Sequence, residues 1–262
     1  MIPSERADFI CKQLNITVNT DDMQFVQPEV NKRNDAMIDM ESLLGRRCYG
    51  GFDLSTREDF TAAALEFPLD DGRVFVLLHT WVPRRKVELD QEKIDYYGLA
   101  MRGHLTIVEG EYVRQEDVYD WFCEQAKKYE IVTIGYDPAN ATRLRQMLEG
   151  RGFACEVVRQ GPVTLNDPMK DIKELLLAGR VVSNRDPMLL WYTDNVRLSG
   201  ERRHADKQNW MPTKRNKFRK IDGFMAWLDA HCINMQKNPA GEVYHKPAVR
   251  VIDIRSRHRA AR

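Results

Sequence analysis

The chain has 262 residues, of which 43% are hydrophobic, and its formal net charge is +1. This length and composition allow a sizeable buried core and fit one large domain with extensions better than two full domains. No apolar run approaches the ~20 residues of a membrane span, and the N-terminus lacks the charged and apolar regions of a signal peptide. We therefore expect a globular, soluble, intracellular protein.

The cysteines and the distribution of charge further restrict the kind of protein that this chain can be. Five cysteines are scattered without any Cys-x-x-Cys pair, which argues against both a disulfide framework and a zinc site. Residues 1–199 carry 25 basic and 33 acidic side chains, whereas residues 200–262 carry 15 and 6. A basic end of this kind points to nucleic acid, although a basic tail is often only a solvated one.

The N-terminal segment, residues 1–46, shows neither sustained alternation nor a long amphipathic stripe, so we interpret it as a connector and not as core. Three runs rich in β-branched and aromatic residues follow. Turn signals at residues 55–58 and 70–72 separate them, which predicts antiparallel strands joined by hairpins. The predicted strands are Cys48–Leu54, Phe60–Phe67 and Val74–Val82.

Helical spacing and further strand-like runs alternate through the rest of the chain. The nearly continuous apolar run at 131–137 is typical of a strand buried on both faces. We expect helices at 87–101, 115–129, 139–151, 169–178, 187–196 and 219–235, and strands at 104–108, 131–137 and 153–158.

This element order predicts an α/β domain with a mixed central sheet flanked by helices, which is the order of the RNase H-like fold. We place the domain at residues 47–236. Residues 1–46 precede it as the connector, and residues 237–262 follow it as a basic C-terminal tail.

Three aspartates in unlike settings are the candidate catalytic and metal-binding residues. Asp53 and Asp137 end strand-like runs, and Asp222 opens the last predicted helix. Active sites in open α/β sheets cluster beyond the carboxyl ends of strands, and a helix N-terminus favours an ionised carboxylate. One fold could thus gather all three around two Mg²⁺ or Mn²⁺ ions, which prefer carboxylate and water ligands.

Asp53 and Asp137 also have simpler interpretations. Asp53 fits the cap of a hairpin turn. Asp137, followed by Pro138, fits the N-cap of a helix with proline at its first position. Asp59, across the turn from Asp53, is expected to be a turn residue or an auxiliary ligand.

Three further side chains near these positions have separate expectations. Asp229 lies about 10 Å along the final helix from Asp222, too far to share one ion with it, and is expected to be a surface charge. His204 is a weak candidate for contact with phosphate or water. His231 is expected to be structural.

A cluster of cations precedes Asp222. Lys214, Arg215 and Lys217 are the candidate DNA-binding residues, because lysine and arginine supply sequence-independent affinity for phosphate. The interleaved Trp210 and Phe218 are candidates for packing on sugar or base. A solvated lead-in to the helix is the alternative.

Over about residues 9–235 the chain resembles the large terminase subunit of tailed bacteriophages. The resemblance lies in the order and spacing of short pieces. These are Leu43–Ser55 with Asp59 and the residues after it, Tyr136-Asp137, Leu175–Arg180, Asp186–Trp191 with Asn195-Val196, and Lys214–Ala226.

The resemblance implies the C-terminal nuclease domain of that subunit, an RNase H-like endonuclease that cuts concatemeric double-stranded viral DNA during packaging. It implies metal-binding roles for Asp53, Asp137 and Asp222. The implied partners are DNA, an ATPase domain, a small terminase subunit and the portal, in the host cytoplasm. Because no G-x-x-x-x-G-K-[ST] motif is present, we expect an excised domain without its ATPase motor.

Two other functions fit the same residues. Another RNase H-like DNA enzyme, of the resolvase or transposase type, would share the carboxylates but prefer branched or end-specific DNA. A non-catalytic module that docks on DNA or the portal would use the basic tail, and its aspartates would be only caps and turn residues.

Overall fold

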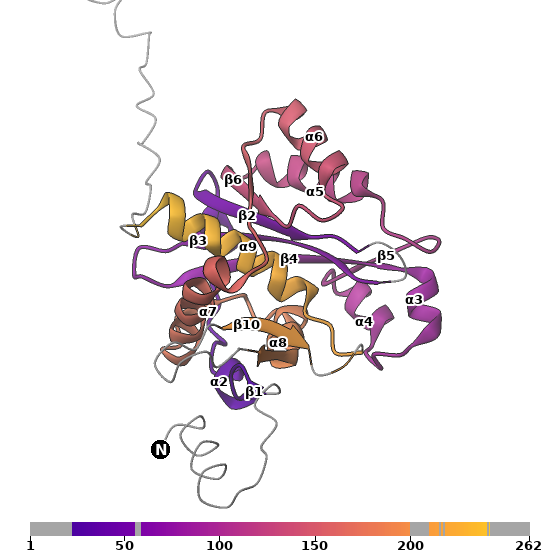
Figure 1. Ribbon diagram of the computed structural model, residues 1–262, viewed down its shortest axis with the longest axis horizontal. Helices are drawn as coiled ribbons and strands as arrows, with labels where there is room; N and C mark the ends of the chain where they lie inside the picture. The colour runs from indigo at the N-terminus through magenta and orange to yellow at the C-terminus, as the bar shows by residue number, and fades with distance from the viewer. Residues whose placement is uncertain are drawn as a thin grey trace, which may run out of the picture.

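The computed structural model describes residues 23–55, 59–199, 210–214, 216, 218–239 and 241. Its centre is a mixed sheet in the order β5-β4-β3-β2-β6-β7, with β8 paired to β4 (Figure 1). The strands of this sheet are β2 Arg47–Asp53, β3 Thr61–Pro68, β4 Val74–Pro83, β5 Thr106–Val108, β6 Glu130–Tyr136, β7 Cys155–Val157 and β8 Val181–Val182. A smaller sheet joins β1 Met23–Gln24, β9 Val196–Ser199 and β10 Met211–Lys214.

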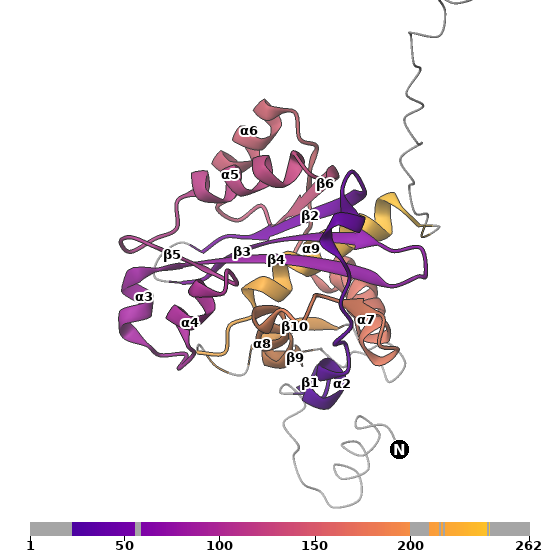
Figure 2. The same cartoon turned by 180° about the vertical axis from the view of Figure 1, so that it is seen from behind.

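Helices cover both faces of the central sheet. Figure 1 shows α5 and α6 on one face, and α9, α7 and α8 on the other; Figure 2 shows α3 and α4 at one end, beside β5. The helices are α2 Pro28–Lys32, the 3₁₀ helix η2 Met40–Leu43, α3 Arg84–Leu89, α4 Tyr96–Met101, α5 Gln115–Ala126, α6 Thr142–Arg151, α7 Pro162–Leu177, α8 Pro187–Asn195 and α9 Asp222–Lys237. None of the described helices is long and apolar enough to cross a bilayer.

The strand pairing confirms the predicted fold class. β2, β3 and β4 form consecutive antiparallel pairs, and β6 and β7 then add in parallel beyond β2. A parallel pair needs a crossover connection, and α5 and α6 occupy the chain between these strands. The result is the predicted α/β domain with a mixed sheet between helical layers.

The alternation of side chains along the strands divides the core in two. On β3, Ala62 and Ala64 face the α9 side, whereas Ala63 and Leu65 face the α5 side. The α9 side is filled largely by Phe224, Trp227 and Leu228 and by residues of α7 and α8. The opposite side is filled by residues such as Phe52, Val118, Phe122, Leu144 and Leu148.

Two glycines bring α9 close to the sheet. Gly51 of β2 and Gly135 of β6 are register partners, and both lie beneath α9. A Cβ atom at Gly51 would come within 2.1 Å of the Ala226 carbonyl oxygen, and one at Gly135 within 2.7 Å of the Asp229 carbonyl oxygen. Only residues without a side chain allow this approach, so the pair fixes where α9 crosses the strands.

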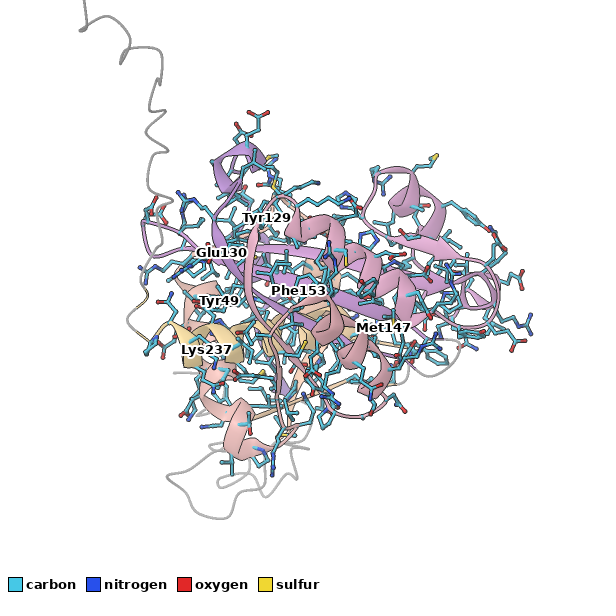
Figure 3. All side chains as sticks on the ribbon, turned by 90° about the horizontal axis from the view of Figure 1, so that it is seen from above. Tyr49, Tyr129, Glu130, Met147, Phe153 and Lys237 are labelled. Carbon is cyan, nitrogen blue, oxygen red and sulfur yellow. The ribbon has the colours of Figure 1, made fainter. Side chains whose placement is uncertain are left out.

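The direction of α9 follows from its ends. Figure 3 shows Lys237, its last residue, on the same side of the molecule as Tyr49 and Glu130 near the starts of β2 and β6. Its first residue, Asp222, therefore lies toward the ends of those strands, where Asp53 is.

Several expectations differ from the structure. The single helix predicted at 87–101 is two short helices, because Asp90 and Lys93 adopt positive φ angles of 41° and 53°. The helix predicted from Ala139 begins at Thr142. Strands β1 and β9, which pair Met23 with Leu198, were not predicted.

The segment before the domain is not excluded from the core. Phe25, Val26 and Leu43 are buried in it, so the expectation that residues 1–46 contribute no core is wrong for the part that the structure describes. Asn34 also joins this segment to the domain: its Nδ2 donates to the Leu176 carbonyl, and its Oδ1 accepts from the Val181 N–H. The domain boundary at residue 46 stays a prediction.

Candidate active site

Asp53 and Asp137 lie side by side at the carboxyl end of the sheet. Phe52 of β2 pairs in parallel with Tyr136 of β6, and each aspartate is the next residue of its chain. Neighbouring strands are about 4.8 Å apart. Asp53 and Asp137 also stand two residues beyond Gly51 and Gly135, so alternation directs both side chains toward α9.

Asp137 organises the turn that follows it. Its Oδ1 accepts a hydrogen bond of 3.0 Å from the backbone N–H of Ala139. The helix itself starts later, at Thr142, and no described side chain caps it. Asp137 therefore stabilises a turn and not the helix N-terminus, and a carboxylate oxygen stays available beyond the strand end.

Asp222 is the first residue of α9, and its carboxylate is poorly compensated. Its Oδ2 is buried and has no hydrogen-bond partner within the described residues. Burial and the nearby charge of Asp59 raise the pKa of Asp222 to about 7. A buried acceptor with no donor is costly, so this oxygen is suited to a ligand with positive charge.

Asp53 completes the convergence. Burial raises the pKa of Asp53 well above its ordinary value, and the charges of Asp222, Asp137 and Asp59 raise it further. These effects require the carboxylates to be near one another. The structure thus brings together residues that lie far apart in the sequence, on β2, after β6 and on α9. We call Asp53, Asp137 and Asp222 the acidic site.

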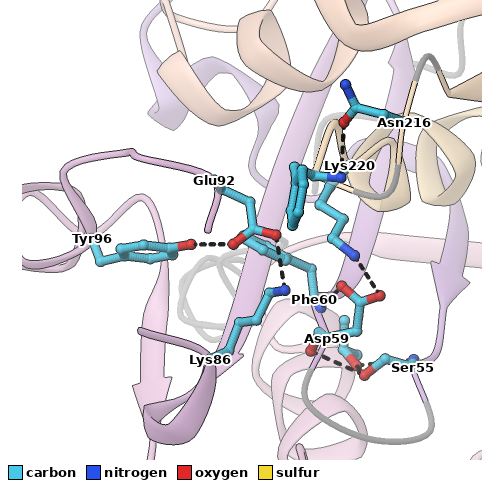
Figure 4. Close-up of polar contacts among 10 residues, drawn as sticks. Ser55, Asp59, Phe60, Lys86, Glu92, Tyr96, Asn216 and Lys220 are labelled. Carbon is cyan, nitrogen blue, oxygen red and sulfur yellow. Dashed lines mark hydrogen bonds and ion pairs between the residues drawn. The ribbon is translucent and has the colours of Figure 1, made fainter. Parts of the chain in front are cut away.

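Asp59 has a supporting place beside this site (Figure 4). Its Oδ2 lies 2.7 Å from Nζ of the buried Lys220, and its Oδ1 accepts from the Phe60 N–H. The Ser55 hydroxyl donates to the Asp59 carbonyl. Asp59 is therefore a turn residue, as one interpretation expected, and it also anchors the chain two residues before Asp222.

A second buried ion pair lies close by in Figure 4. Nζ of Lys86 lies 2.8 Å from Oε1 of Glu92, and the Tyr96 hydroxyl donates to the other carboxylate oxygen of Glu92. Tyr96 in turn packs against Phe60, with ring centroids 6.2 Å apart. The pair ties α3 and α4 together beside the turn that holds Asp59.

Asp229 is not the surface charge that we expected. It is 1% exposed, accepts a 3.1 Å hydrogen bond from Gln160 and receives another from the backbone of Asp137. Burial and the charge of Asp53 raise its pKa well above the ordinary value. Asp229 does lie two turns along α9 from Asp222, as the spacing predicted. However, α9 lies directly on Gly51 and Gly135, so the face of α9 that carries Asp229 is closed to solvent.

Glu66 is a buried carboxylate that was not among the residues predicted to matter. It is fully buried on β3 and accepts hydrogen bonds from Trp227, His231 and Asn234 of α9, at 2.6, 2.9 and 2.6 Å. Nε2 of His231 lies 3.0 Å from Asp171. We call these five residues the Glu66 cluster. The sequence feature that could have indicated its importance is a single glutamate within an otherwise apolar strand.

His231 is structural, as expected. Burial lowers the pKa of His231, but Glu66 and Asp171 more than offset this, and the pKa rises to about 9. The imidazole is therefore charged near neutral pH and links two carboxylates on β3 and α7. His204 lies outside the described residues.

Of the candidate DNA-binding residues, only Lys214 is described. It is exposed at the end of β10, and its charge lowers the pKa values of both Asp53 and Asp222, so it lies near the acidic site. Arg215 and Lys217 lie outside the described residues. Trp210 is half-buried beneath Lys173, whose Nζ lies 4.7 Å from the ring centroid, so this tryptophan packs against α7.

The donor set of the acidic site fits a hard divalent cation. It consists of carboxylate oxygens, the ligands that Mg²⁺ and Mn²⁺ prefer, and it includes the unpartnered Oδ2 of Asp222. Across the described residues, no group of three or more His, Cys, Asp or Glu side chains is placed so that it could hold a metal ion. The fit of this site to a divalent cation therefore rests on the chemistry of carboxylate ligands and on the proximity of the three aspartates.

A cleft of about 640 Å³ opens next to this site. Leu54 and Ser55, which follow Asp53, form part of its wall, and so does Asn140, three residues after Asp137. Arg114 and Arg143 also line it. None of the three aspartates lines this cleft, which lies on the α5 face of the same sheet edge.

Comparison with known proteins agrees with this geometry. The family model described as "Terminase large subunit, endonuclease domain" matches residues 2–236. The chain is 25% identical over 236 residues to Protein YmfN of Escherichia coli (strain K12), covering 85% of this chain and 50% of that protein. It is 26% identical over 149 residues to the terminase large subunit of Enterobacteria phage HK97, covering 55% of this chain and 29% of that protein.

A solved structure supports the fold. The crystal structure of the HK97 bacteriophage large terminase superposes with a TM-score of 0.73 at 22% identity, covering 88% of this chain and 48% of that one. The RNase H-like fold predicted from the element order is therefore confirmed. The chain spans about half the length of Protein YmfN and of the HK97 structure.

Proposed function

The chain belongs to the terminase large subunit endonuclease domain family, and from that premise we propose that it is a metal-dependent endonuclease that cuts concatemeric double-stranded DNA during viral genome packaging. The observation that carries the proposal is the convergence of Asp53, Asp137 and Asp222 at one end of the sheet, with the Oδ2 of Asp222 buried and unpartnered. The family assignment favours this function over a resolvase, a transposase or a docking module.

Each residue of the acidic site has a distinct role in the proposal. Asp53 and Asp137 present oxygens from adjacent parallel strands, and Asp222 adds its own from the first turn of α9. Two bound Mg²⁺ or Mn²⁺ ions would activate the attacking water and stabilise the leaving oxygen. Lys220, paired with Asp59, holds the start of α9 in place.

Substrate binding would use the cations around this site. Lys214 lies near Asp53 and Asp222 and is suited to a DNA phosphate; Arg215 and Lys217, its neighbours in sequence, are assigned the same role. Contacts to phosphate carry no sequence information, so we expect low sequence preference. An ATPase domain, a small terminase subunit and a portal are the proposed partners, in the host cytoplasm.

Plasmid digestion tests the proposal. The wild-type protein is expected to cut supercoiled plasmid with Mn²⁺ and to stop when EDTA is added. Asp53→Asn should reduce cutting by at least about 10³-fold, because the variant loses a charged ligand of the cations. The matched control is Asp120→Asn, on the exposed face of α5, which should cut like wild type.

Two outcomes would contradict the proposal. The first is full cutting by Asp53→Asn. The second is a wild-type protein that cuts neither plasmid nor linear duplex with Mn²⁺ although its thermal melt shows a folded domain.

A further inference from the structure

The cleft beside the acidic site has features that the proposed chemistry does not use. Its wall joins the chain after Asp53 to the loop after Asp137, and it opens between the starts of α5 and α6. Gln115 and Asn140 both line it, and Gln115 Nε2 donates a hydrogen bond of 2.9 Å to the Asn140 carbonyl. The cleft therefore lies at the same edge of the sheet as Asp53 and Asp137, but on the α5 face, whereas the two aspartate side chains point toward α9.

Two arginines give this cleft its charge. Arg114 and Arg143 are 67% and 70% exposed in their side chains, so neither is needed to fill the core. Each is held in place by one acidic neighbour: Arg114 lies 2.6 Å from Asp117, and Arg143 pairs with Glu116. Exposed ion pairs of this kind are worth little to stability.

The start of α6 adds to the attraction for an anion. No described side chain caps this helix, and its first turn contains no acidic residue. The backbone N–H groups of such a helix start carry partial positive charge and have no intrahelical acceptors. They add to the field of Arg143, which lies in the same turn.

From these observations we infer that the cleft between α5 and α6 binds the backbone of the DNA strand that leads away from the scissile phosphate, with Arg114 and Arg143 contacting successive phosphates. This rests on the proposed function for the identity of the substrate. Glu116 limits the affinity, because it competes with phosphate for Arg143. The cleft thus positions duplex DNA relative to Asp53 and Asp137.

Duplex binding with Ca²⁺ in place of Mn²⁺ tests this inference in the full chain without cutting. The probe is a fluorescein-labelled 30-base-pair duplex, followed by anisotropy across a range of NaCl concentrations. The Arg114→Ala, Arg143→Ala double variant should bind about tenfold more weakly at low salt. The slope of log K against log[salt] should become shallower by about 2, because each lost phosphate contact removes about 0.9.

Two matched variants sharpen the test. Glu116→Gln frees Arg143 without removing any cation and should bind the duplex roughly two- to fivefold more tightly, because charge competition is relieved. Arg145→Ala removes a cation from the same helix, one that pairs with Glu149 outside the cleft, and should bind like wild type.

The outcomes separate the two proposals. Wild-type affinity and salt slope in the double variant overturn the inference, as does a Glu116→Gln variant that binds no more tightly than wild type. If the double variant fails to give a wild-type melt, Glu116→Gln decides alone. A wild-type protein that does not cut with Mn²⁺ overturns the proposed function, whereas the salt slopes still report whether the cleft binds DNA.

Discussion

Two groups of carboxylates lie along α9, and they differ in how many hydrogen-bond donors surround them. In the Glu66 cluster, three side chains of α9 donate hydrogen bonds to one buried carboxylate. In the acidic site, at the other end of α9, burial and the charges of Asp222 and Asp137 raise the pKa of Asp53, burial and the charge of Asp59 raise the pKa of Asp222, and the Oδ2 of Asp222 has no described partner. Burying a carboxylate costs little free energy only when hydrogen-bond donors surround it.

The comparison indicates different roles for the Glu66 cluster and the acidic site. The Glu66 cluster is complete within the protein and joins β3, α7 and α9. The acidic site is incomplete without an outside positive charge, which is the arrangement expected of a metal site. If the proposed function holds, stability and metal binding divide along α9, and substitutions at its two ends should have opposite effects on stability.

The largest effect on stability is expected at Glu66. Glu66→Ala leaves Trp227, Asn234 and a charged His231 without their buried acceptor, so the free energy of unfolding should fall by about 3–5 kcal/mol. Urea denaturation measures this. The exposed Glu109→Ala, which removes the surface partner of Arg84, should change the curve little. A Glu66→Ala variant as stable as wild type would contradict the structural role of the cluster.

The pH dependence of stability is the next largest effect. Because the pKa of His231 rises to about 9 in the folded protein, from about 6.5 when unfolded, its contribution is complete below pH 6.5. It should be lost as the pH rises through 9, by roughly 3–3.5 kcal/mol, since the shift is about 2.5 pKa units and each unit corresponds to about 1.4 kcal/mol. Urea midpoints between pH 6 and 9.5 measure the loss.

The matched variant for this pH effect is His231→Gln. Groups away from His231 titrate equally in both proteins, so the difference between the two curves reports the His231 charge together with its pairing to Glu66 and Asp171. Parallel curves for wild type and variant would show that His231 is not held in its charged form.

A smaller effect of opposite sign is expected at the acidic site. Asp222→Asn removes a carboxylate whose pKa is raised to about 7, so at pH 8 in EDTA the protein should gain roughly 1–2 kcal/mol of stability. It should also lose most of the rise in melting temperature that Mn²⁺ gives the wild type. A destabilised Asp222→Asn protein would show that the carboxylate is already well compensated.

Local sequence patterns predicted the part of the fold that depends on local signals. The turn residues before Val74 and the apolar run of β6 predicted strands that differ from the structure by at most one residue at each end. The same patterns placed Asp53 and Asp137 at strand ends and Asp222 at a helix start. Their proximity followed only from the family resemblance and the expected sheet order.

The patterns failed where distant segments meet. The pairing of β1 with β9 joins residues more than 170 positions apart, and no local period reports it. The burial of Asp229 and the donors to Glu66 depend on how closely α9 lies on the sheet. Gly51 and Gly135 permit that approach, but their meaning became clear only from their register.

The most direct test of the acidic site is a crystal of the protein soaked in MnCl₂ and measured at the manganese absorption edge. The account predicts anomalous peaks within coordination distance, about 2.0–2.3 Å, of carboxylate oxygens of Asp53, Asp137 and Asp222. Peaks elsewhere on the molecule, or none in a crystal whose lattice leaves this site open to solvent, would contradict it.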